Sequence, residues 1–235
     1  MFTVYAHRGA SEYAPENTMS SFCLGLKMGA NGIETDVRRT KDGVLVLFHD
    51  DTLERVIGKD GGAGDYTYAE LLQMRVRNDK TGTDDIVVSF EDFLKYFGFR
   101  EITFAIEIKE KGIEADVLEL LEKYGMRPKT VITSFEFDCI KTVKELNASY
   151  KVGYLVSDFD DGKLQKVRDI GGEQLCPQAK NVTAEKVKLW HEMGYDVRAW
   201  GVTNVKLMKN AYDCGVDGMT VNFPDLLVSY LVSKQ

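Results

Sequence analysis

The sequence predicts an α/β fold of the (β/α)8 type, the TIM barrel, from three observations. From residue 102 to residue 221, short β-branched runs alternate with helical patterns, and successive strands start roughly 20–28 residues apart. Two further strand-like runs precede this region. The length of 235 residues fits eight such units, because barrels of this type have about 250 residues and seldom fewer than about 200.

Eight segments are the predicted barrel strands. Repeated β-α units place such strands in one parallel sheet that is covered by helices. In chain order they are Thr3 to His7, Asn31 to Val37, Ile102 to Ile108, Thr130 to Ser134, Lys151 to Val156, Gln174 to Cys176, Val197 to Trp200 and Gly218 to Val221. A doubly wound open sheet is the alternative, but no GxGxxG motif follows the first strand and the sequence contains no Walker loop.

The interval between strands doubles between Asp51 and Arg100. This stretch is rich in glycine and polar residues and contains two helical pieces, Tyr68 to Met74 and Phe90 to Phe97. We therefore predict a single catalytic domain over residues 1–235 with an inserted subdomain over residues 51–100. The insertion lies between the hairpin that carries His49 and the strand that carries Glu107, which predicts a position at the barrel mouth.

Composition excludes several classes of protein. Asp and Glu (37) outnumber Lys and Arg (30), and the net charge of −7 argues against a nucleic-acid partner. No segment approaches 18 uninterrupted apolar residues, and the N-terminal residues do not resemble a signal peptide, so we expect no stable membrane insertion. Four widely spaced cysteines without a CxxC pair indicate reduced thiols and a cytoplasmic location. No pattern predicts an oligomeric state.

A hairpin around Asp42-Gly43 is predicted to bring acidic residues together. With these two residues as the loop, Asp36 faces His49 across the ladder, and Glu34 lies on the same side of the sheet. An exposed cross-strand pair is the alternative. Two carboxylates on one buried face need a cation or a proton, and hard oxygen ligands favour Mg²⁺ or Ca²⁺ over zinc.

Further polar residues stand at strand ends that meet at the same rim. Glu107 and Lys109 share one face near the end of a strand, where a barrel carries its active site; a buried ion pair is the alternative. His7 ends the first strand and is a candidate site residue; a buried core histidine is the alternative. The adjacent Arg8 offers a bidentate set of donors that suits phosphate. His191 lies in the last turn of a helix and is predicted to be a surface residue. The other residues together predict a phosphodiester-cleaving site around one metal ion.

In their order along the chain, these segments resemble the glycerophosphodiester phosphodiesterase family, which is related to the phosphatidylinositol-specific phospholipase C barrels. The resemblance covers essentially the whole chain. The matching segments are His7-Arg8-Gly9, Pro15-Glu16-Asn17-Thr18, Gly32-Ile33-Glu34-Thr35-Asp36-Val37, Asp42-Gly43 through His49-Asp50, Asp65-Tyr66-Thr67 with Ala69-Glu70-Leu71, Glu107-Ile108-Lys109, Trp200 with Val202, and Asp217-Gly218.

The resemblance implies hydrolysis of a small-molecule glycerophosphodiester to sn-glycerol 3-phosphate and an alcohol. Carried over by position, three carboxylates would hold one divalent cation (Mg²⁺ or Ca²⁺, with Mn²⁺ as a third candidate), two histidines would be acid and base, and three residues would bind the substrate. These are Glu34, Asp36 and Glu107 for the metal, His7 and His49 for proton transfer, and Arg8, Lys109 and Trp200 for the substrate. Which histidine is the acid, and whether water or the glycerol 2-hydroxyl attacks, stay open.

Two segments depart from the family pattern, and three alternative functions stay open. The chain has Val221-Asn222 where the family commonly has Thr-Asp, and Gly201-Val202-Thr203 where Thr-Val-Asn is usual, which affects the fit of the substrate. A related phosphodiesterase or lysophospholipase D acting on lipid-derived diesters is one alternative. A Schiff-base aldolase that uses Lys109 is another, and a non-catalytic phosphate-binding module is a third.

Overall fold

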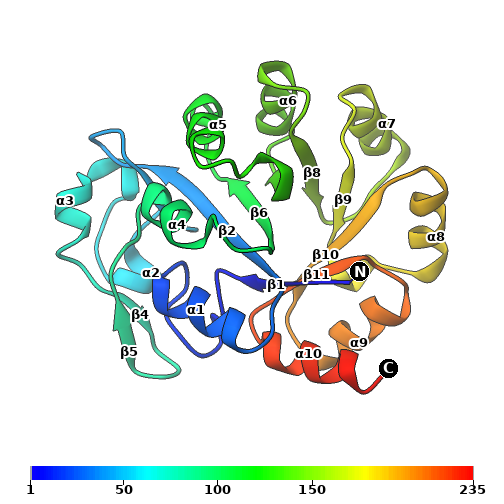
Figure 1. Cartoon of the computed structure of the whole chain (residues 1–235), viewed down its shortest axis with the longest axis horizontal. Helices are drawn as coiled ribbons and strands as arrows, with labels where there is room; N and C mark the ends of the chain where they lie inside the picture. The colour runs from blue at the N-terminus through cyan, green and yellow to red at the C-terminus, as the bar shows by residue number, and fades with distance from the viewer. Residues whose placement is uncertain (1, 235) are drawn as a thin grey trace.

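Eight parallel strands form a closed barrel in the computed structural model, which describes residues 2–234 (Figure 1). The strands pair in the order β1-β11-β10-β9-β8-β7-β6-β2, and β1 also pairs with β2, which closes the ring. The predicted TIM barrel is confirmed, and each predicted segment supplies one strand. Their bounds are β1 (Thr3–His7), β2 (Gly32–Arg39), β6 (Thr103–Ile108), β7 (Thr130–Ser134), β8 (Lys151–Val156), β9 (Gln174–Pro177), β10 (Asp196–Val202) and β11 (Gly218–Val221).

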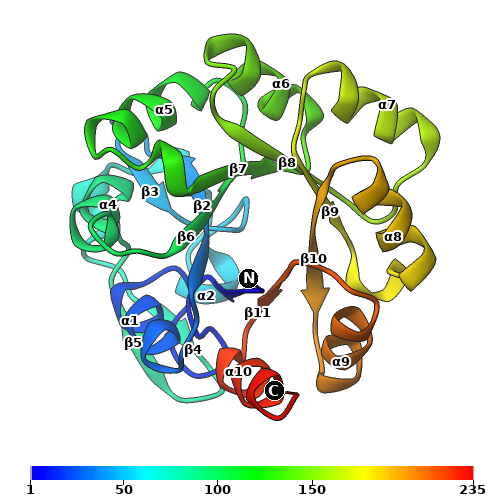
Figure 2. The same ribbon diagram turned by 45° about the vertical axis from the view of Figure 1, so that its right-hand side comes forward.

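One long helix follows each barrel strand before the next begins, and Figure 2 shows these helices as an outer ring. None of the helices within residues 2–234 has the length and apolar character needed to cross a membrane. The helix bounds are α1 (Met19–Lys27), α4 (Phe90–Phe97), α5 (Glu114–Lys123), α6 (Phe137–Leu146), α7 (Asp161–Asp169), α8 (Ala184–Glu192), α9 (Val205–Asp213) and α10 (Pro224–Val232), with short 3-10 turns at Arg127–Lys129 and Ala179–Asn181.

The helix α4 belongs to the outer layer of the barrel. Its Phe93 ring lies 4.9 Å from the Phe22 ring of α1 and 5.9 Å from the Phe104 ring of β6, and all three side chains are fully buried. The Ser89 side chain caps the helix by accepting a hydrogen bond from the Asp92 backbone N–H. This aromatic cluster anchors α4 between α1 and β6.

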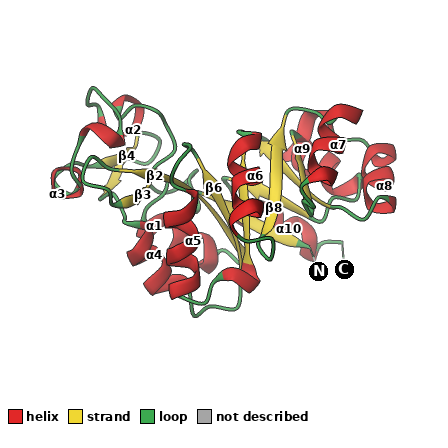
Figure 3. Cartoon of the chain, turned by 90° about the horizontal axis from the view of Figure 1, so that it is seen from above, coloured by secondary structure: helices red, strands yellow, loops and turns green. Residues whose placement is uncertain are grey.

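The segment between β2 and α4 packs around a small core of its own. It contains β3 (Leu45–Leu47), α2 (Glu54–Ile57), a 3-10 turn (Ala63–Asp65), α3 (Tyr68–Leu71), β4 (Val76–Asn78) and β5 (Thr83–Asp85). Figure 3 shows α2, α3 and β4 grouped beside β2 and β3 at one side of the barrel. The part that packs separately is therefore shorter at its C-terminal end than the predicted insertion over 51–100, because α4 packs with the barrel.

The hairpin between β2 and β3 differs from the prediction by one residue. Val37 pairs with Leu47 and Thr40 with Val44, so the loop has three residues, and Gly43 supplies the left-handed position (φ 86°) that such loops require. The prediction that Asp36 faces His49 is wrong. Phe48 donates its backbone N–H to the Asp36 carbonyl instead, and His49 follows in the loop after β3.

Candidate active site

The first strand ends in a tight turn that holds His7 and Arg8 at the barrel mouth. Arg8 has a left-handed backbone (φ 55°), which is uncommon for a residue other than glycine and recurs at functional sites. At Gly9, a Cβ atom would lie 2.4 Å from backbone carbon of Ser21, so only glycine allows α1 to approach this turn. The turn is further fixed by hydrogen bonds from the Arg8 backbone N–H to the backbone and side chain of Glu34.

Three buried carboxylates converge at the ends of β2 and β6. The parallel register places Asp36 beside Glu107, and Glu34 lies two residues before Asp36 on the same face. The residues Glu34, Asp36 and Glu107 are 3%, 0% and 6% exposed, and one oxygen of each lies within 4.8 Å of the others. We call these three residues the carboxylate triad.

Two basic side chains face the triad from opposite sides. The Arg8 Nε atom lies 3.3 Å from Asp36 Oδ2, while Lys109 Nζ lies 2.7 Å from Glu107 Oε1 and 3.8 Å from Asp36 Oδ1. Burial opposes ionisation of Asp36, but Arg8, His49 and Lys109 outweigh it and hold the pKa of Asp36 well below its ordinary value. Burial and the neighbouring Asp36 charge raise the pKa of both Glu34 and Glu107.

The donor set of the triad fits a divalent cation. Asp36 Oδ1 is buried and has no hydrogen-bond partner among residues 2–234. A carboxylate oxygen in that position is costly unless a cation completes its surroundings. Carboxylates are the ligands that Mg²⁺ and Ca²⁺ prefer, and here they also repel one another in the absence of a cation.

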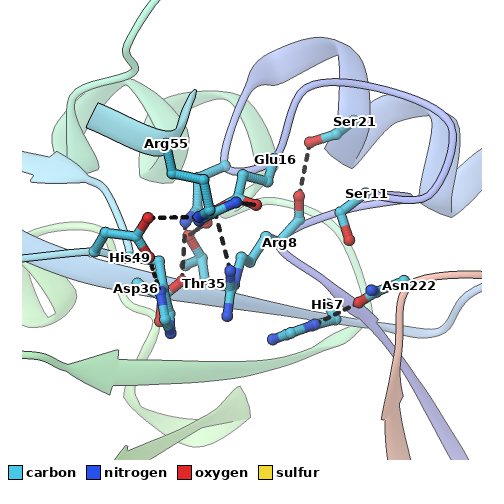
Figure 4. Close-up of polar contacts among 12 residues, drawn as sticks. His7, Arg8, Ser11, Glu16, Ser21, Thr35, Asp36, His49, Arg55 and Asn222 are labelled. Atoms are coloured by element: carbon cyan, nitrogen blue, oxygen red, sulfur yellow. Dashed lines mark hydrogen bonds and ion pairs between the residues drawn. The ribbon is translucent and has the colours of Figure 1, made fainter. Parts of the chain in front are cut away.

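The two histidines have different hydrogen-bond partners. His7 Nδ1 lies 2.5 Å from Asn222 Oδ1, an oxygen that only accepts, so the histidine donates (Figure 4). Burial and the Arg8 charge lower the pKa of His7 to about 3. His49 Nδ1 lies 2.6 Å from Asp50 Oδ1, and Arg55 Nε donates to the other oxygen of that carboxylate at 2.6 Å.

A second set of contacts holds the His49 loop in place. Arg38, which is 8% exposed, donates two hydrogen bonds to the His49 carbonyl, at 2.9 and 3.2 Å. The guanidinium of Arg55 binds Glu16 as well as Asp50, and Glu16 in turn accepts from Arg8 (Figure 4). Burial opposes ionisation of Asp50, but the hydrogen bonds from Arg55 and His49 outweigh it and lower its pKa to about 2. A continuous chain of charged side chains thus runs from His49 to Arg8, the residue that follows His7 in the sequence.

Comparison with known proteins identifies the family of this chain. A family model described as the glycerophosphoryl diester phosphodiesterase family matches residues 7–226. The chain belongs to this family. It is 32% identical over 240 residues to a glycerophosphodiester phosphodiesterase of Bacillus altitudinis (97% of both chains), and 30% identical over 239 residues to one of Caldanaerobacter subterraneus (98% of both chains).

A solved structure supports the same conclusion. A phosphodiesterase of Oleispira antarctica, solved in complex with the product sn-glycerol-3-phosphate, superimposes with a TM-score of 0.87 at 25% identity, covering 98% of this chain and 96% of that one. The protein is therefore a phosphodiesterase, and glycerophosphodiester phosphodiesterase activity is supported by its family and its relatives.

The phosphodiesterase barrel brings all eight predicted site residues to one end. A cavity of about 180 Å³ is lined by His7, Arg8, Glu34, His49, Glu107 and Trp200, among others. Lys109 lines the adjoining cavity of about 530 Å³. The Trp200 indole N–H donates to the Val156 carbonyl at 2.9 Å, and the ring meets Phe135 edge to face at 4.8 Å. His191 binds Asp217 at 2.8 Å and is 38% exposed, which confirms the surface position predicted for it.

Three residues at this end of the phosphodiesterase escaped the sequence prediction. Asn17 donates to Asp36 Oδ2 at 2.9 Å, Asn222 accepts from His7, and Arg198 lines the cavity of about 180 Å³. Asn17 has a left-handed backbone (φ 57°) immediately before the N-cap Thr18. Asparagine tolerates this conformation better than most residues, so the residue type itself was the local signal. Asn17 belongs to the matching segment Pro15-Glu16-Asn17-Thr18, but the resemblance assigned it no role. The other two residues depend on contacts with distant parts of the chain.

Proposed function

We propose that this phosphodiesterase hydrolyses glycerophosphodiesters to sn-glycerol 3-phosphate and an alcohol with the help of a divalent cation held by Glu34, Asp36 and Glu107. The observation that carries the proposal is the buried carboxylate triad. One of its oxygens, Asp36 Oδ1, is buried and accepts no hydrogen bond from residues 2–234. Mg²⁺ or Ca²⁺ fits this oxygen-only donor set, and Mn²⁺ is a third candidate. When bound, such an ion neutralises charge on the phosphodiester and polarises its P–O bonds.

Arg8 and Lys109 are proposed to bind the phosphate. Their carboxylate partners keep both side chains charged and directed toward the triad, from the β1 side and the β6 side respectively. A phosphodiester anion repels nucleophiles, and two cations placed at its oxygens offset that repulsion. Trp200, whose ring packs against Phe135, is proposed to form an apolar wall for the carbon atoms of the bound substrate.

The two histidines are proposed to act as base and acid. Because His7 donates its Nδ1 proton to the neutral Asn222 amide, its Nε2 atom carries the lone pair, and that atom lies 3.9 Å from Glu34. His7 is thus suited to take a proton from the attacking water or hydroxyl. His49 donates to the Asp50 carboxylate, an arrangement that stabilises an imidazolium, so His49 is suited to protonate the leaving alcohol.

The surroundings of Lys109 do not support the Schiff-base aldolase alternative. A nucleophilic amine must be neutral, which requires a lowered pKa. Burial works in that direction here, but Asp36 and Glu107 outweigh it and raise the pKa of Lys109. We therefore expect borohydride trapping with carbonyl substrates to leave no adduct on Lys109.

The test of the proposal combines activity with direct ion binding. Glycerophosphodiesters of several alcohols are assayed with Mg²⁺, Ca²⁺ and Mn²⁺ after chelation, and ion binding is followed by calorimetry. We expect activity only with added cation, and the double variant Glu34→Ala, Asp36→Ala should lose both activity and ion binding. The control is Glu101→Ala, Glu192→Ala, since these acidic residues are 96% and 63% exposed. Full activity in excess chelator would contradict the proposal.

A further inference from the structure

Arg198 is a charged side chain buried inside the barrel. It is 1% exposed, and its guanidinium lies 5.2 Å from the centre of the Tyr5 ring. It donates from Nε to Gln174 at 3.0 Å and from Nη1 to Thr220 at 2.7 Å, and Nη2 contacts the Cys176 sulfur at 3.6 Å. Barrel interiors are usually filled by branched apolar residues, and a buried charge is costly, so this arginine calls for an explanation.

The neighbouring strands leave room for the partners of this arginine. A Cβ atom at Gly153 would lie 3.0 Å from the Cys176 sulfur and 3.1 Å from the Gln174 side-chain oxygen. A Cβ atom at Gly32 would lie 2.9 Å from the Tyr5 ring, on which the guanidinium rests. The position of Arg198 is therefore fixed by residues of several strands.

Arg198 also lines the cavity of about 180 Å³ that contains His7, Glu34 and Glu107. Thr220, which binds Arg198, pairs with Tyr5 and so lies two residues below the level of His7 in the barrel. Arg198 and Thr220 form the floor of the cavity, beneath the triad. A guanidinium has five N–H groups, and the contacts with Gln174, Thr220 and Cys176 use three, which leaves donors for a ligand.

The charges around the cavity indicate which ligand group fits at its floor. Three carboxylates in the triad are matched by three cations, Arg8, Lys109 and Arg198. The proposed function already provides an anionic partner for the cations at the triad, namely the phosphate, so the N–H groups that Arg198 has left at the floor are suited to a neutral hydroxyl, which accepts hydrogen bonds. The side walls include the apolar surfaces of Phe135, Leu155 and Trp200, which suit C–H groups.

We propose that Arg198 recognises the terminal hydroxyl of the glycerol arm of the substrate. This proposal rests on the proposed function, because it places the phosphate at the triad and the retained glycerol in the cavity below. The hydroxyl farthest from the phosphate is then the one that reaches the floor. Arg198 thus selects diesters whose glycerol is unesterified, since the guanidinium is only 1% exposed and a cavity of about 180 Å³ leaves little space beside it for an acyl chain on that hydroxyl.

The test compares two substrates on one enzyme. One is a glycerophosphocholine, and the other is its 1-deoxy analogue, which keeps the 2-hydroxyl but has a methyl group in place of the terminal CH₂OH. The wild type should prefer the first by roughly 10–100-fold in kcat/KM, because the analogue leaves buried donors without a partner. A wild-type enzyme that hydrolyses both equally would overturn the proposal without any variant. A wild-type enzyme inactive on every glycerophosphodiester would overturn the proposed function as well.

Variants then assign the preference to Arg198. Arg198→Met should lower kcat/KM roughly 10–100-fold on glycerophosphocholine and change it little on the 1-deoxy analogue. Arg198→Lys should recover part of the preference for glycerophosphocholine. Tyr5→Phe is the matched control, because it alters the same buried group of residues without removing a cavity donor. If Arg198→Met lowered both rates equally and kept the preference, the role of Arg198 would be structural. Slow hydrolysis of 1-acyl lysophosphatidylcholine by the wild type is a further expected result.

Discussion

The two histidines at the barrel mouth occupy opposite electrostatic surroundings. His7 ends β1, beside the Arg8 guanidinium, and its Nδ1 donates to the neutral amide of Asn222. His49 follows β3, and its Nδ1 donates to the Asp50 carboxylate, which Arg55 also binds. A neutral acceptor favours a neutral imidazole with a free Nε2 atom, whereas a carboxylate favours the protonated form. In the proposed function, this difference suits His7 to the role of base and His49 to the role of acid.

The largest expected effect comes from removing either histidine. His7→Ala and His49→Ala should each lose on the order of 10²–10⁴ in kcat/KM with an alkyl leaving group, because general acid or base catalysis typically contributes that much. A p-nitrophenyl ester needs no general acid, so His49→Ala should recover much of its rate on that substrate while His7→Ala should not. Steady-state kinetics on both substrates make the measurement.

The surface residue His191 provides the control for this comparison. It is bound to Asp217 and lies outside the cavity, so His191→Ala should keep wild-type rates on both substrates. Equal losses in His7→Ala and His49→Ala with both leaving groups would rule out a division into acid and base. The histidines would then serve as ligands of the metal or the phosphate.

A smaller effect is expected when the partner of His49 is neutralised. Asp50→Asn keeps the size of the side chain but removes the charge that stabilises a protonated His49, so the rate with an alkyl leaving group should fall by about tenfold. The p-nitrophenyl substrate should show little loss. Asp84→Asn is the matched control, because the carboxylate of Asp84 is 56% exposed and lies near Arg75 rather than a histidine. Equal losses in the two variants would contradict the role of Asp50.

The converse change gives His7 a charged partner. Asn222→Asp places a carboxylate at Nδ1, which favours the imidazolium and raises the pKa of His7 from its lowered value of about 3. A base must be unprotonated, so the acid limb of kcat/KM against pH should move to higher pH. Asn204→Asp adds the same charge at the N-cap of α9, where Asp caps as well as Asn, and should leave the limb in place. An acid limb that does not move would show that Asn222 does not act through His7.

The fold was predictable from the sequence because buried parallel strands are nearly continuous apolar runs. The same property exposed Glu34, Asp36 and Glu107, since charged residues interrupt runs such as Ile106 to Ile108. The His49 register was not predictable, because Asp-Gly occurs in two-residue and three-residue loops alike, and Thr40 decides between them by accepting from the Val44 N–H. Asn222 meets His7 across 215 residues of sequence, a separation that no local pattern records.

The smallest expected effect concerns stability and follows from the lowered pKa of His7. Unfolding restores its ordinary pKa of 6.5, so below that pH the unfolded chain takes up a proton that folded His7 accepts only near pH 3. The contribution of His7 to stability is therefore complete above pH 6.5 and falls as the pH is lowered toward 3. At pH 5.5 the loss is about 1 kcal/mol.

Urea unfolding in chelator between pH 7.0 and 5.5 measures this contribution. His7→Gln removes the titrating group, so its free energy of unfolding should fall by about 1 kcal/mol less than that of the wild type over this range. For Asn222→Asp, the fall in the free energy of unfolding should lie between those of the other two proteins. This variant raises the pKa of folded His7, so the pH range in which only the unfolded state binds the proton is narrower. Parallel curves for all three proteins would show that His7 is not held in its neutral form. The contrast between the two histidines would then rest on His49 alone.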